Sequence, residues 1–375
     1  MRVAFIGTRG VPATFGGIEH HVEEVGGRLA ARGHDVTVYC RANYVDDSQR
    51  GYKGMRLARL PTVSSKRLDA IVHSALSTAR ALGQGYDVVH FHALGPGVMT
   101  PVAQYASRAR VVQTIHGLDD ERAKWGSGAR VLLRGGGWLS ARVPDATVVV
   151  SRTLADHYMQ KYGRRTTYIP NGVAAPARSP APQEIATRFG LHGGDYVLFV
   201  GRLVPEKAPD LLLRAFRRVP GDVRLVIAGG SSFTDRYTDS LVDMAAEDKR
   251  VVLPGYVYGD TLAELYANAG AFVLPSVVEG LPLTLLEAAS YGTPVVASAI
   301  GPHTEIVGSD RPGHRLVPPG DDGALAAALL QTLAGGPEVE AGAEQLRERV
   351  LTEYSWDRAV DATEALYRRL TGPSA

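Results

Sequence analysis

Two cations in the second half of the chain follow an apolar run at a spacing that suits phosphate chemistry. Arg202 and Lys207 are five residues apart in the segment GRLVPEK, directly after the apolar run at 196–200. A loop that follows a buried strand of a parallel sheet lies at the edge where such sheets bind ligands. A guanidinium offers a fork of donors and an ammonium offers a point charge, so the pair suits a diphosphate. We therefore predict a diphosphate site at these two residues.

Two carboxylates further along the chain flank the start of a predicted helix. Glu279 and Glu287 are eight residues apart in EGLPLTLLE, with a proline near the first helical position and a glycine just past the helix end. Because eight residues span slightly more than two turns, both side chains can contact one ligand at different depths. The free backbone amides of Leu283 and Thr284 would then point at the phosphates of that ligand.

A glycine pair marks a second candidate phosphate site near the start of the chain. Gly16 and Gly17 stand directly before a predicted helix, where unpaired amides and the helix dipole can hold a phosphate; an ordinary loop explains such a pair equally well. The earlier loop, GTRG at 7–10, lacks the G-x-G-x-x-G pattern, and the next strand ends in Cys40 and Arg41 where a dinucleotide site needs an acidic residue. The sequence also lacks a P-loop and a G-x-S-x-G motif, which excludes those ATPases and hydrolases.

The elements that must position these residues alternate along both halves of the chain. Apolar residues four, three and four apart from 18 to 29 predict a helix that ends at Gly33, between two predicted strands. The same alternation continues through the first half and restarts after residue 195. The predicted strands are at 3–7, 36–40, 88–92, 110–115, 146–150, 167–169, 196–201, 223–229, 251–253, 272–275 and 295–297. We therefore predict an α/β protein with two Rossmann-like, doubly wound parallel sheets.

The length of 375 residues requires more than one ordinary domain. A Pro- and Ala-rich stretch at 176–182 is typical of a linker, so we place one domain at 1–175 and a second at 176–354. A final predicted helix from about 356 to 370 carries Trp356 and other large residues on one face and must pack against another element.

Composition and charge exclude several classes of protein. With 45% hydrophobic and 21% charged residues the chain is neither disordered nor membrane-spanning, and its one cysteine, Cys40, excludes a disulfide framework and a cysteine metal cluster. The chain opens on the strand-like MRVAFIG and has no run of 18 apolar residues, so we expect a cytoplasmic protein.

The two halves of the chain differ in net charge. Residues 1–175 carry 23 Lys and Arg against 13 Asp and Glu, a net +10, whereas 176–375 carry 18 against 26, a net −8. The basic half favours an anionic partner, with drift in surface charge as the alternative.

Taken together, these motifs resemble those of the retaining, nucleotide-sugar-dependent glycosyltransferases of family 4. That family has an E-x7-E motif, matched by Glu279 and Glu287, a G-R-x(n)-K motif, matched by Arg202 and Lys207, and an N-terminal glycine pair. The resemblance covers essentially the whole chain, including the segment PNGV before the linker. It implies the two-domain GT-B architecture, in which two Rossmann-like domains face each other across a cleft and the C-terminal helix, here about 355–375, packs back onto the N-terminal domain. The opening GTRGVPATFGGIEHHVEEV and the segment HGLDDERAKW resemble most the branch that assembles bacterial surface polysaccharides.

The resemblance implies roles for the charged motif residues. Arg202 and Lys207 are expected to bind and neutralise the diphosphate of the donor, whose charge grows as it leaves. Glu287 is expected to hold the ribose hydroxyls and Glu279 the hydroxyls of the donor sugar. Backbone amides at 282–284 are expected near the phosphates.

The donor base stays open at this stage. In the family it is recognised largely by backbone, here near Val257, and Gly16 and Gly17 also belong to the donor site. A UDP-sugar is the default donor, and a GDP- or dTDP-sugar is the alternative; no further cofactor is implied. No D-x-D motif occurs in the chain, so we predict that no metal is required.

Several histidines lie at predicted strand ends in the first half. The family places a histidine beside the donor sugar at the position of His116, and a histidine satisfied within the strand end is the alternative. His90 and His92 alternate along VVHFH and are expected to point to opposite faces, which disfavours a metal site shared by the two. Asp119 and Asp120, with the glutamate that follows them, are candidates for contact with acceptor hydroxyls, although a solvated acidic loop explains them equally well.

The basic segment SSKRLDAIVHSALSTARAL at 64–82 has two possible roles. As an amphipathic helix flanked by Lys66, Arg67 and Arg80 it can dock on an anionic membrane at the inner face and bring the enzyme to a lipid-linked acceptor. Alternatively it covers the sheet, which we favour. Its expected apolar stripe comprises Leu68, Ile71, Val72, Ala75, Leu76 and Ala79.

The implied activity is transfer of a sugar from a nucleotide-diphosphate sugar to a hydroxyl acceptor, without a protein nucleophile. The rival interpretations are a nucleotide-sugar 2-epimerase of the same fold and a non-catalytic nucleotide-sugar binding subunit. Nucleic-acid binding explains the basic half but none of the motifs, and no basic stretch is interleaved with aromatic residues, so we expect no nucleic-acid partner.

Overall fold

Two parallel sheets divide the chain into two units. The computed structural model describes residues 1–14, 16–63, 69–117, 127–177, 180–230 and 235–372. The first unit comprises Met1–Gly172 and Trp356–Ala375, and the second comprises Val173–Ser355. The first unit is therefore discontinuous in sequence, since its last helix follows the whole of the second unit.

The sheet of the first unit has the strand order β3-β4-β2-β1-β5-β6-β7-β8. Every neighbouring pair is parallel except β3 with β4. Its central strands are buried on both faces, which is why they are continuous apolar runs and not alternating patterns. The bounds are β1 (Arg2–Ile6), β2 (Asp35–Arg41), β3 (Gly51–Tyr52), β4 (Met55–Leu60), β5 (Val88–His92), β6 (Arg110–Ile115), β7 (Ala146–Val149) and β8 (Thr167–Tyr168).

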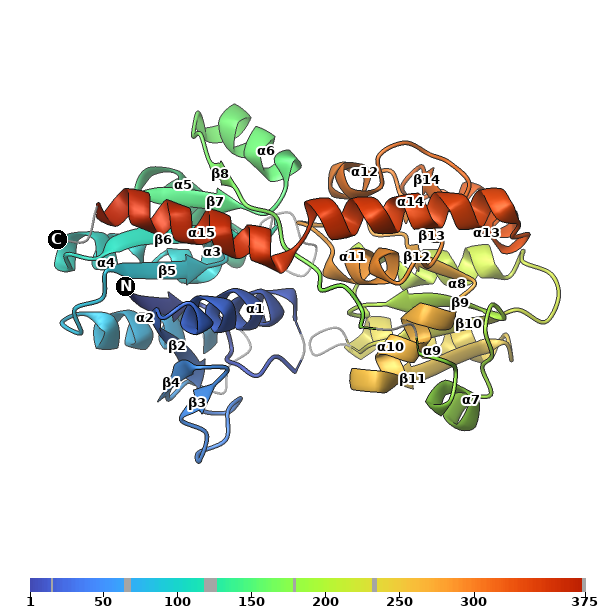
Figure 1. The fold of residues 1–375 in the computed structure, drawn as a ribbon, viewed down its shortest axis with the longest axis horizontal. Coiled ribbons are helices and arrows are strands. Elements are labelled where there is room, and N and C mark those ends of the chain that lie inside the picture. Colours follow the sequence, from blue (N-terminus) through green and yellow to red (C-terminus); the bar gives the residue numbers. More distant parts are fainter. Residues whose placement is uncertain (15, 64–68, 118–126, 178–179, 231–234, 373–375) are drawn as a thin grey trace. The chain divides into compact units, whose positions relative to one another are not determined.

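Helices cover both faces of this sheet. Figure 1 shows α1 and α15 together in front of it, and these two helices contact each other. On the other face α3 contacts both α2 and α5. The bounds are α1 (Gly17–Ala31), α2 (Asp69–Ala81), α3 (Leu94–Gly97), α4 (Thr100–Ala106), α5 (Ser127–Arg142), α6 (Arg152–Tyr162) and α15 (Trp356–Thr371).

The C-terminal helix α15 is bound to the first unit by polar contacts as well as by packing. Arg32 lies 2.7 Å from Asp361 and 3.0 Å from Glu364 across the contact with α1. Deeper in, the hydroxyl of Tyr367 lies 2.5 Å from Nδ1 of His90, and both residues are buried. The helix is thus an integral part of the core of this unit.

The second unit contains a six-stranded sheet, all parallel, in the order β11-β10-β9-β12-β13-β14. On one side of β9 lie β10 and then β11, and on its other side lie β12, β13 and β14, each set in the order of the sequence. The reversal between β9 and β12 is the topological switch point at which such sheets bind ligands. The bounds are β9 (Tyr196–Val200), β10 (Arg224–Ala228), β11 (Val251–Gly255), β12 (Ala271–Leu274), β13 (Val295–Ser298) and β14 (His314–Val317).

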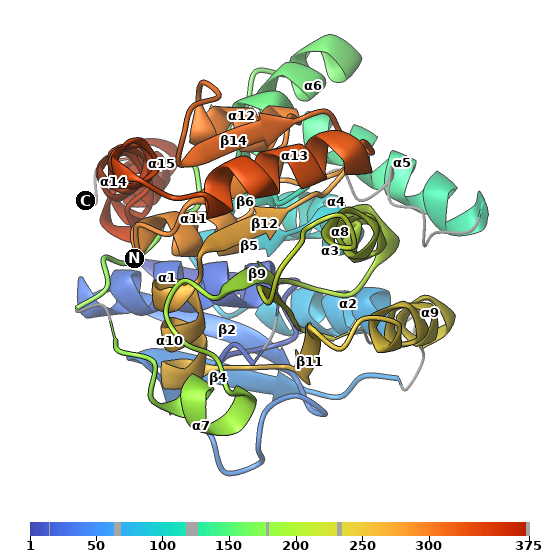
Figure 2. The ribbon, with the colours of Figure 1, turned by 90° about the vertical axis from the view of Figure 1, so that its right-hand side faces the viewer.

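Helices also lie on both faces of the second sheet. Figure 2 shows α8, α9 and α13 on one face, where α8 contacts the other two, and α10, α11 and α14 on the other, where α11 contacts both neighbours. The bounds are α7 (Glu184–Phe189), the 3-10 turn η2 (Pro205–Lys207), α8 (Pro209–Phe216), α9 (Asp235–Ala246), α10 (Gly259–Asn268), α11 (Leu283–Ser290), α12 (Gly301–Val307), α13 (Asp322–Leu333) and α14 (Pro337–Glu353). The predicted fold class, two Rossmann-like doubly wound α/β domains, is confirmed. None of the helices among the described residues has the length and apolar character needed to cross a membrane.

Candidate functional site

Two loops at the switch point of the second sheet bring a predicted cation and a predicted carboxylate together. The loop after β9 carries Lys207, and the loop after β12 carries Glu279. Lys207 Nζ donates to Glu279 Oε1 at 2.5 Å, and the two side chains are 13% and 9% exposed. The contact joins residues 72 positions apart in sequence, because parallel strands that are neighbours in the sheet end at the same edge.

The electrostatics of this pair keep Glu279 charged. Burial raises the pKa of the Glu279 carboxyl, but the positive charge of Lys207, together with smaller contributions from His303 and from hydrogen bonding, holds that pKa below its usual value. An anionic carboxylate with one oxygen engaged by Lys207 has a second oxygen with which to accept hydrogen bonds from a hydroxylated ligand.

Arg202, the other predicted cation, pairs with a different carboxylate. Its guanidinium lies 3.7 Å from Oε1 of Glu206, whose side chain is only 5% exposed. The backbone carbonyl of Glu206 also accepts a hydrogen bond from the amide of Val277 at 2.9 Å, which ties the two switch-point loops together. Glu206 was not predicted from the sequence, although it stands between the two cations in the same motif.

Helix α11 presents its N-terminus next to the Glu279 loop. Leu283 and Thr284 are its first two residues, and Pro282 at the N-cap makes no side-chain capping bond. The hydroxyl oxygen of Thr284 is buried without a hydrogen-bond partner in the part of the chain that the structure describes. The first amides of α11 therefore form an end that favours an anion.

Glu287 lies within α11 and is oriented by a buried tyrosine. The hydroxyl of Tyr266, in α10, donates to Oε2 of Glu287 at 2.7 Å. Burial and the negative charge of Glu287 raise the pKa of Tyr266 well above its usual value, so the phenol stays protonated and acts as the donor. Of the four predicted side chains, Lys207 and Glu279 thus pair with each other, Arg202 lies beside Glu206, and Glu287 is held by Tyr266.

The loop after β11 contains Val257 between two exposed tyrosines. Val257 is 8% exposed, while the rings of Tyr256 and Tyr258 stack 6.1 Å apart. Tyr256 packs over Gly230, where an added Cβ would lie 2.6 Å from the ring. The two tyrosine rings thus flank the backbone segment at Val257 that is predicted to contact the base.

The loop after β10 approaches the loop after β9 very closely. Gly229 has φ +139°, and a Cβ added to it would lie 1.8 Å from the carbonyl oxygen of Gly201. Only glycine fits there, because any side chain would collide with backbone just before Arg202.

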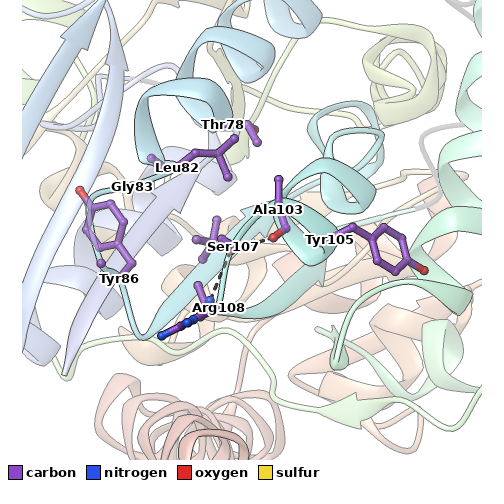
Figure 3. Close-up of a pocket in the computed structure, with 13 residues that line it drawn as sticks. Thr78, Leu82, Gly83, Tyr86, Ala103, Tyr105, Ser107 and Arg108 are labelled. Atoms are coloured by element: carbon purple, nitrogen blue, oxygen red, sulfur yellow. Dashed lines mark hydrogen bonds between the residues drawn. The ribbon is translucent and has the colours of Figure 1, made fainter.

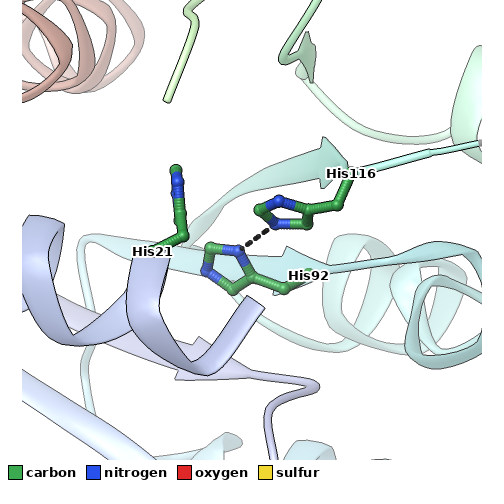
Figure 4. A group of neighbouring side chains, drawn as sticks. All are labelled: His21, His92 and His116. Carbon is green, nitrogen blue, oxygen red and sulfur yellow. Dashed lines mark hydrogen bonds between the residues drawn. The ribbon is translucent and has the colours of Figure 1, made fainter. Parts of the chain in front are cut away.

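In the first unit, a cluster of histidines gathers at the end of the central strands (Figure 4). His21 is on α1, His92 is the last residue of β5, and His116 follows β6. His92 Nδ1 lies 3.1 Å from His116 Nε2, and His21 Nδ1 lies 2.9 Å from Oδ1 of Asn171. Burial lowers the pKa of His21 to about 4 and that of His92 well below its usual value, so both rings are neutral at pH 7.

The expectation that His90 and His92 point to opposite faces is wrong. Their rings stack with centroids 4.4 Å apart. Successive side chains of a strand alternate between faces, so residues two positions apart share a face. His90 is engaged elsewhere as well, because its Nε2 lies 2.6 Å from the hydroxyl of Thr114.

The glycine pair at the start of α1 has an acidic neighbour. Gly16 is the N-cap residue with φ +105°, and Gly17 is the first residue of α1. A Cβ on Gly16 would lie 2.2 Å from Oε2 of Glu19, whose other oxygen accepts the amide of Arg9 at 3.1 Å. The carboxylate of Glu19 thus already lies at this helix N-terminus.

Other predicted residues lie outside the described part of the chain or face a different way. Asp119 and Asp120, with the glutamate after them, fall within 118–126, and Lys66 and Arg67 fall within 64–68, all outside the described residues. In α2 the predicted apolar stripe is not the buried face: Leu76 is 40% exposed. The buried residues of α2 are His73, Ser74, Ser77, Thr78 and Ala81.

The physical reason is that the hydroxyls of α2 are satisfied within the helix itself. Ser74, Ser77 and Thr78 each donate to the backbone carbonyl four residues earlier, at 2.6, 2.7 and 2.8 Å. Small side chains satisfied in this way pack closely on a sheet.

A cavity of about 510 Å³ lies elsewhere in the first unit (Figure 3). It is lined by the end of α2, the loop before β5 and the end of α4, including Thr78, Tyr86, Ala103 and Arg108. These segments precede β5 and β6, so the cavity is at the edge opposite to the strand ends that carry the histidines. None of the predicted site residues lines it.

Comparison with known proteins places the chain among glycosyltransferases. Residues 15–175 match the model described as Glycosyltransferase Family 4, and residues 194–335 match that of Glycosyl transferases group 1. A D-inositol 3-phosphate glycosyltransferase of Geodermatophilus obscurus is 32% identical over 94% of this chain and 84% of its own length. Sucrose-phosphate synthase of Thermosynechococcus elongatus superposes with TM-score 0.85 at 25% identity over the whole of both chains. HepE of Anabaena, solved with UDP and glucose, has TM-score 0.83 at 18% identity and covers 99% of this chain and 100% of its own.

The two doubly wound sheets, with charged residues at a switch point, define the GT-B class of glycosyltransferases. The chain belongs to glycosyltransferase family 4, as its motifs predict, and it is an enzyme.

Proposed function

We propose that the chain transfers a sugar from a nucleotide-diphosphate sugar, in the first instance a UDP-sugar, to a hydroxyl acceptor. We further propose that configuration is retained and that no metal takes part. The observation that carries the proposal is the 2.5 Å contact between Lys207 and Glu279 at the switch point of the second sheet. The complex of HepE with UDP and glucose supports uridine as the base.

In this proposal the second unit holds the donor. Arg202, Lys207 and the first amides of α11, at Leu283 and Thr284, provide the positive potential for the diphosphate, which makes a metal unnecessary. This potential stabilises the negative charge that develops as the diphosphate leaves. Glu279 accepts hydrogen bonds from hydroxyls of the donor sugar.

The same proposal assigns the remaining contacts of the nucleotide. Glu287, held by Tyr266, accepts hydrogen bonds from the ribose hydroxyls. The backbone near Val257 contacts the base beside the stacked tyrosines. Gly16 and Gly17 keep their proposed place near a phosphate, with Glu19 as a competing charge.

The first unit, with α15, is proposed to bind the acceptor and to supply His116 to the donor sugar. The bond from the anomeric carbon to the diphosphate oxygen breaks, and a bond from the acceptor oxygen to that carbon forms on the same face. The acceptor proton passes to the departing diphosphate oxygen, so no protein nucleophile takes part. Asp119 and Asp120 are proposed contacts of the acceptor hydroxyl.

We infer the acceptor and the cellular location from the opening sequence motif and from the relatives. The acceptor is proposed to be an intermediate of surface polysaccharide or glycolipid assembly in the cytoplasm, with peripheral contact to anionic membrane through α2. Flotation with anionic vesicles tests this contact, and failure of the protein to float removes it.

Nucleotide binding and transfer test the proposed reaction. Thermal melting with UDP, GDP and dTDP should show the largest increase in melting temperature with UDP, because a ligand that binds only the folded state stabilises it by about 2.7 kcal/mol at a hundred times its Kd. Lys207→Ala and Glu279→Ala should abolish transfer. The control Arg214→Ala, which removes an exposed ion pair with Asp210 on α8, should retain it. Near-normal transfer by either site variant, inversion at the anomeric carbon, or loss of transfer in EDTA would overturn the corresponding part of the proposal.

A further inference from the structure

The histidine cluster of the first unit has the composition of a metal-binding site. Among the described residues it is the one group of three or more histidine, cysteine or acidic side chains whose ligand atoms converge. We propose that His21, His92 and His116 bind one divalent transition-metal ion of the zinc class. The binding proposal stands on this geometry alone, and its consequence for catalysis rests on the proposed function.

The distances within the cluster are close to those that a shared ion requires. One candidate ligand atom from each ring lies within 4.8 Å of the others. Zinc binds imidazole nitrogen at about 2.0–2.1 Å in tetrahedral geometry, so its ligand nitrogens lie roughly 3.3 Å apart. The pair His92 Nδ1 and His116 Nε2, at 3.1 Å, already meets this spacing.

The third ring is placed to complete the set. The ring centroid of His21 lies 4.8 Å from that of His116 and 5.5 Å from that of His92. Figure 4 shows the three rings around one common space, approached from a helix and two strand ends. The ligand atoms lie within 4.8 Å of one another, so the side chain of His21 has to rotate to bring its nitrogen to the roughly 3.3 Å spacing of zinc ligands.

Neighbouring residues orient the ligands in the way that metal sites require. Asn171 Oδ1 only accepts hydrogen bonds, so His21 Nδ1 carries the proton and Nε2 keeps its lone pair. A ligating histidine whose other nitrogen is held by an oxygen acceptor is the usual arrangement in metal sites. His90 is not a fourth ligand, because Tyr367 and Thr114 engage both of its nitrogens; it stacks on His92 and fixes the plane of that ring.

Hydrogen bonds within the cluster leave one buried ring nitrogen, on His92, without a partner among the described residues. His92 is fully buried, and its Nε2 has no hydrogen-bond partner in the described part of the chain. Burial of polar groups that lack partners opposes folding, so stability alone does not account for this cluster.

The donor set selects the class of ion. Three imidazoles without a carboxylate or thiolate suit Zn²⁺, Co²⁺, Ni²⁺ or Cu²⁺, and they do not suit Mg²⁺ or Ca²⁺, which prefer oxygen. Three protein ligands leave a fourth position for water or another ligand. If His116 contacts the donor sugar as proposed, a metal ion bound to its nitrogen prevents that nitrogen from donating or accepting a hydrogen bond there. The metal then inhibits transfer.

Zinc binding to the intact protein tests the site without any donor. Titration with Zn²⁺ against a chromophoric chelator should give one ion per chain. His21→Gln, His92→Gln and His116→Gln should each weaken binding by at least about 10-fold. The matched control is His20→Gln, one position away on α1, which should bind as the wild type does. Absence of binding to the wild type, or binding by the three variants as tight as that of the wild type, would overturn the site.

A second measurement needs no variant and so does not depend on variant folding. In a ¹⁵N spectrum of the imidazoles, Zn²⁺ should shift the nitrogens of three of the 11 histidines, assigned to these positions. Shifts confined to other histidines would contradict the proposal. If Zn²⁺ binds at the cluster and transfer is unchanged, the metal site is supported, but the proposed role of His116 in transfer is wrong.

Discussion

Nζ of Lys207 lies 2.5 Å from Oε1 of Glu279, and neither side chain is more than 13% exposed. A buried ion pair owes its stability to both partners being present. Removal of one partner leaves the other charge without compensation in a medium where it is poorly solvated.

Lys207→Met should therefore destabilise the second unit by about 3–5 kcal/mol, measured by urea unfolding. The double variant Lys207→Met with Glu279→Leu should recover most of this loss, because no unpaired charge remains. Arg214→Ala, which breaks a more exposed pair with Asp210 (46% and 29% exposed), should change stability by less than about 1 kcal/mol. A double variant as unstable as the single one would show that packing, and not charge, dominates at this site.

A buried histidine next to this pair should make stability depend on pH. Burial lowers the pKa of His303 from 6.5 to about 4, although the charge of Glu279 acts in the opposite direction. In the unfolded chain the His303 side chain binds a proton below pH 6.5, whereas in the folded chain it does so only near pH 4. Protonation thus favours unfolding, and the free energy of unfolding should fall by a few kcal/mol between pH 6.5 and 4.

Urea unfolding midpoints across this range would measure the effect. His303→Gln should make the fall shallower than in the wild type, with the remainder due to other buried histidines such as His21 and His92, while His192→Gln, at an exposed position, should leave the profile unchanged. Identical slopes for the wild type and His303→Gln would assign the pH dependence to other groups.

Two glycines with similar demands on the backbone differ in the space around them. Gly229 and Gly221 both have positive φ, +139° and +83°, but a Cβ on Gly229 would lie 1.8 Å from the carbonyl oxygen of Gly201, while nothing lies within 4 Å at Gly221. Gly221→Ala should lower stability by about 1 kcal/mol from backbone strain alone. Gly229→Ala should lower it by clearly more and should also weaken nucleotide binding, because it displaces the loop that carries Arg202. Calorimetric melting and UDP titration would check both effects, and equal stabilities would refute the steric explanation.

Tyr266 offers a test of the ribose contact. Tyr266→Phe removes the hydroxyl that donates to Glu287 at 2.7 Å and leaves the ring in place. If Glu287 holds the ribose, KM for the donor should rise by roughly 5-fold, equivalent to about 1 kcal/mol, with little change in kcat. Tyr291→Phe, on the neighbouring stacked ring, serves as the control. An unchanged KM would remove the positioning role of Tyr266.

The placement of Lys207 and Glu279 at one edge of the second sheet could be predicted from sequence, because it follows from topology. Arg202 and Glu279 lie in the loops that follow two apolar strands, β9 and β12, and strands that meet at a switch point bring such loops to one edge. The partner of Lys207 could not be predicted, because sequence spacing does not show which carboxylate each cation contacts. Glu206 was missed for the same reason.

Predictions failed where side-chain packing overrides a pattern. The apolar stripe expected in α2 is partly exposed, as at Leu76, because hydroxyls satisfied on their own helix provide a smooth buried face. The convergence of His21 with the two strand-end histidines was also beyond the sequence, since it depends on the packing of α1 against the sheet. The strands β3, β4 and β14 were not predicted: β3 has two residues, β4 carries two arginines among its apolar residues at 55–60, and β14 (HRLV) begins with a histidine and an arginine, so none is a continuous apolar run.

The discontinuity of the first unit imposes an order on its synthesis. All of Val173–Ser355 is synthesised before α15, so the second unit has its complete sequence at a point where the first has all eight of its strands but lacks the helix that contacts α1. Until Tyr367 emerges, His90 lacks its partner and the face of α1 that α15 covers is open to solvent and to chaperones. A free chain truncated after Ser355 should therefore have a protease-sensitive first unit and a resistant second unit.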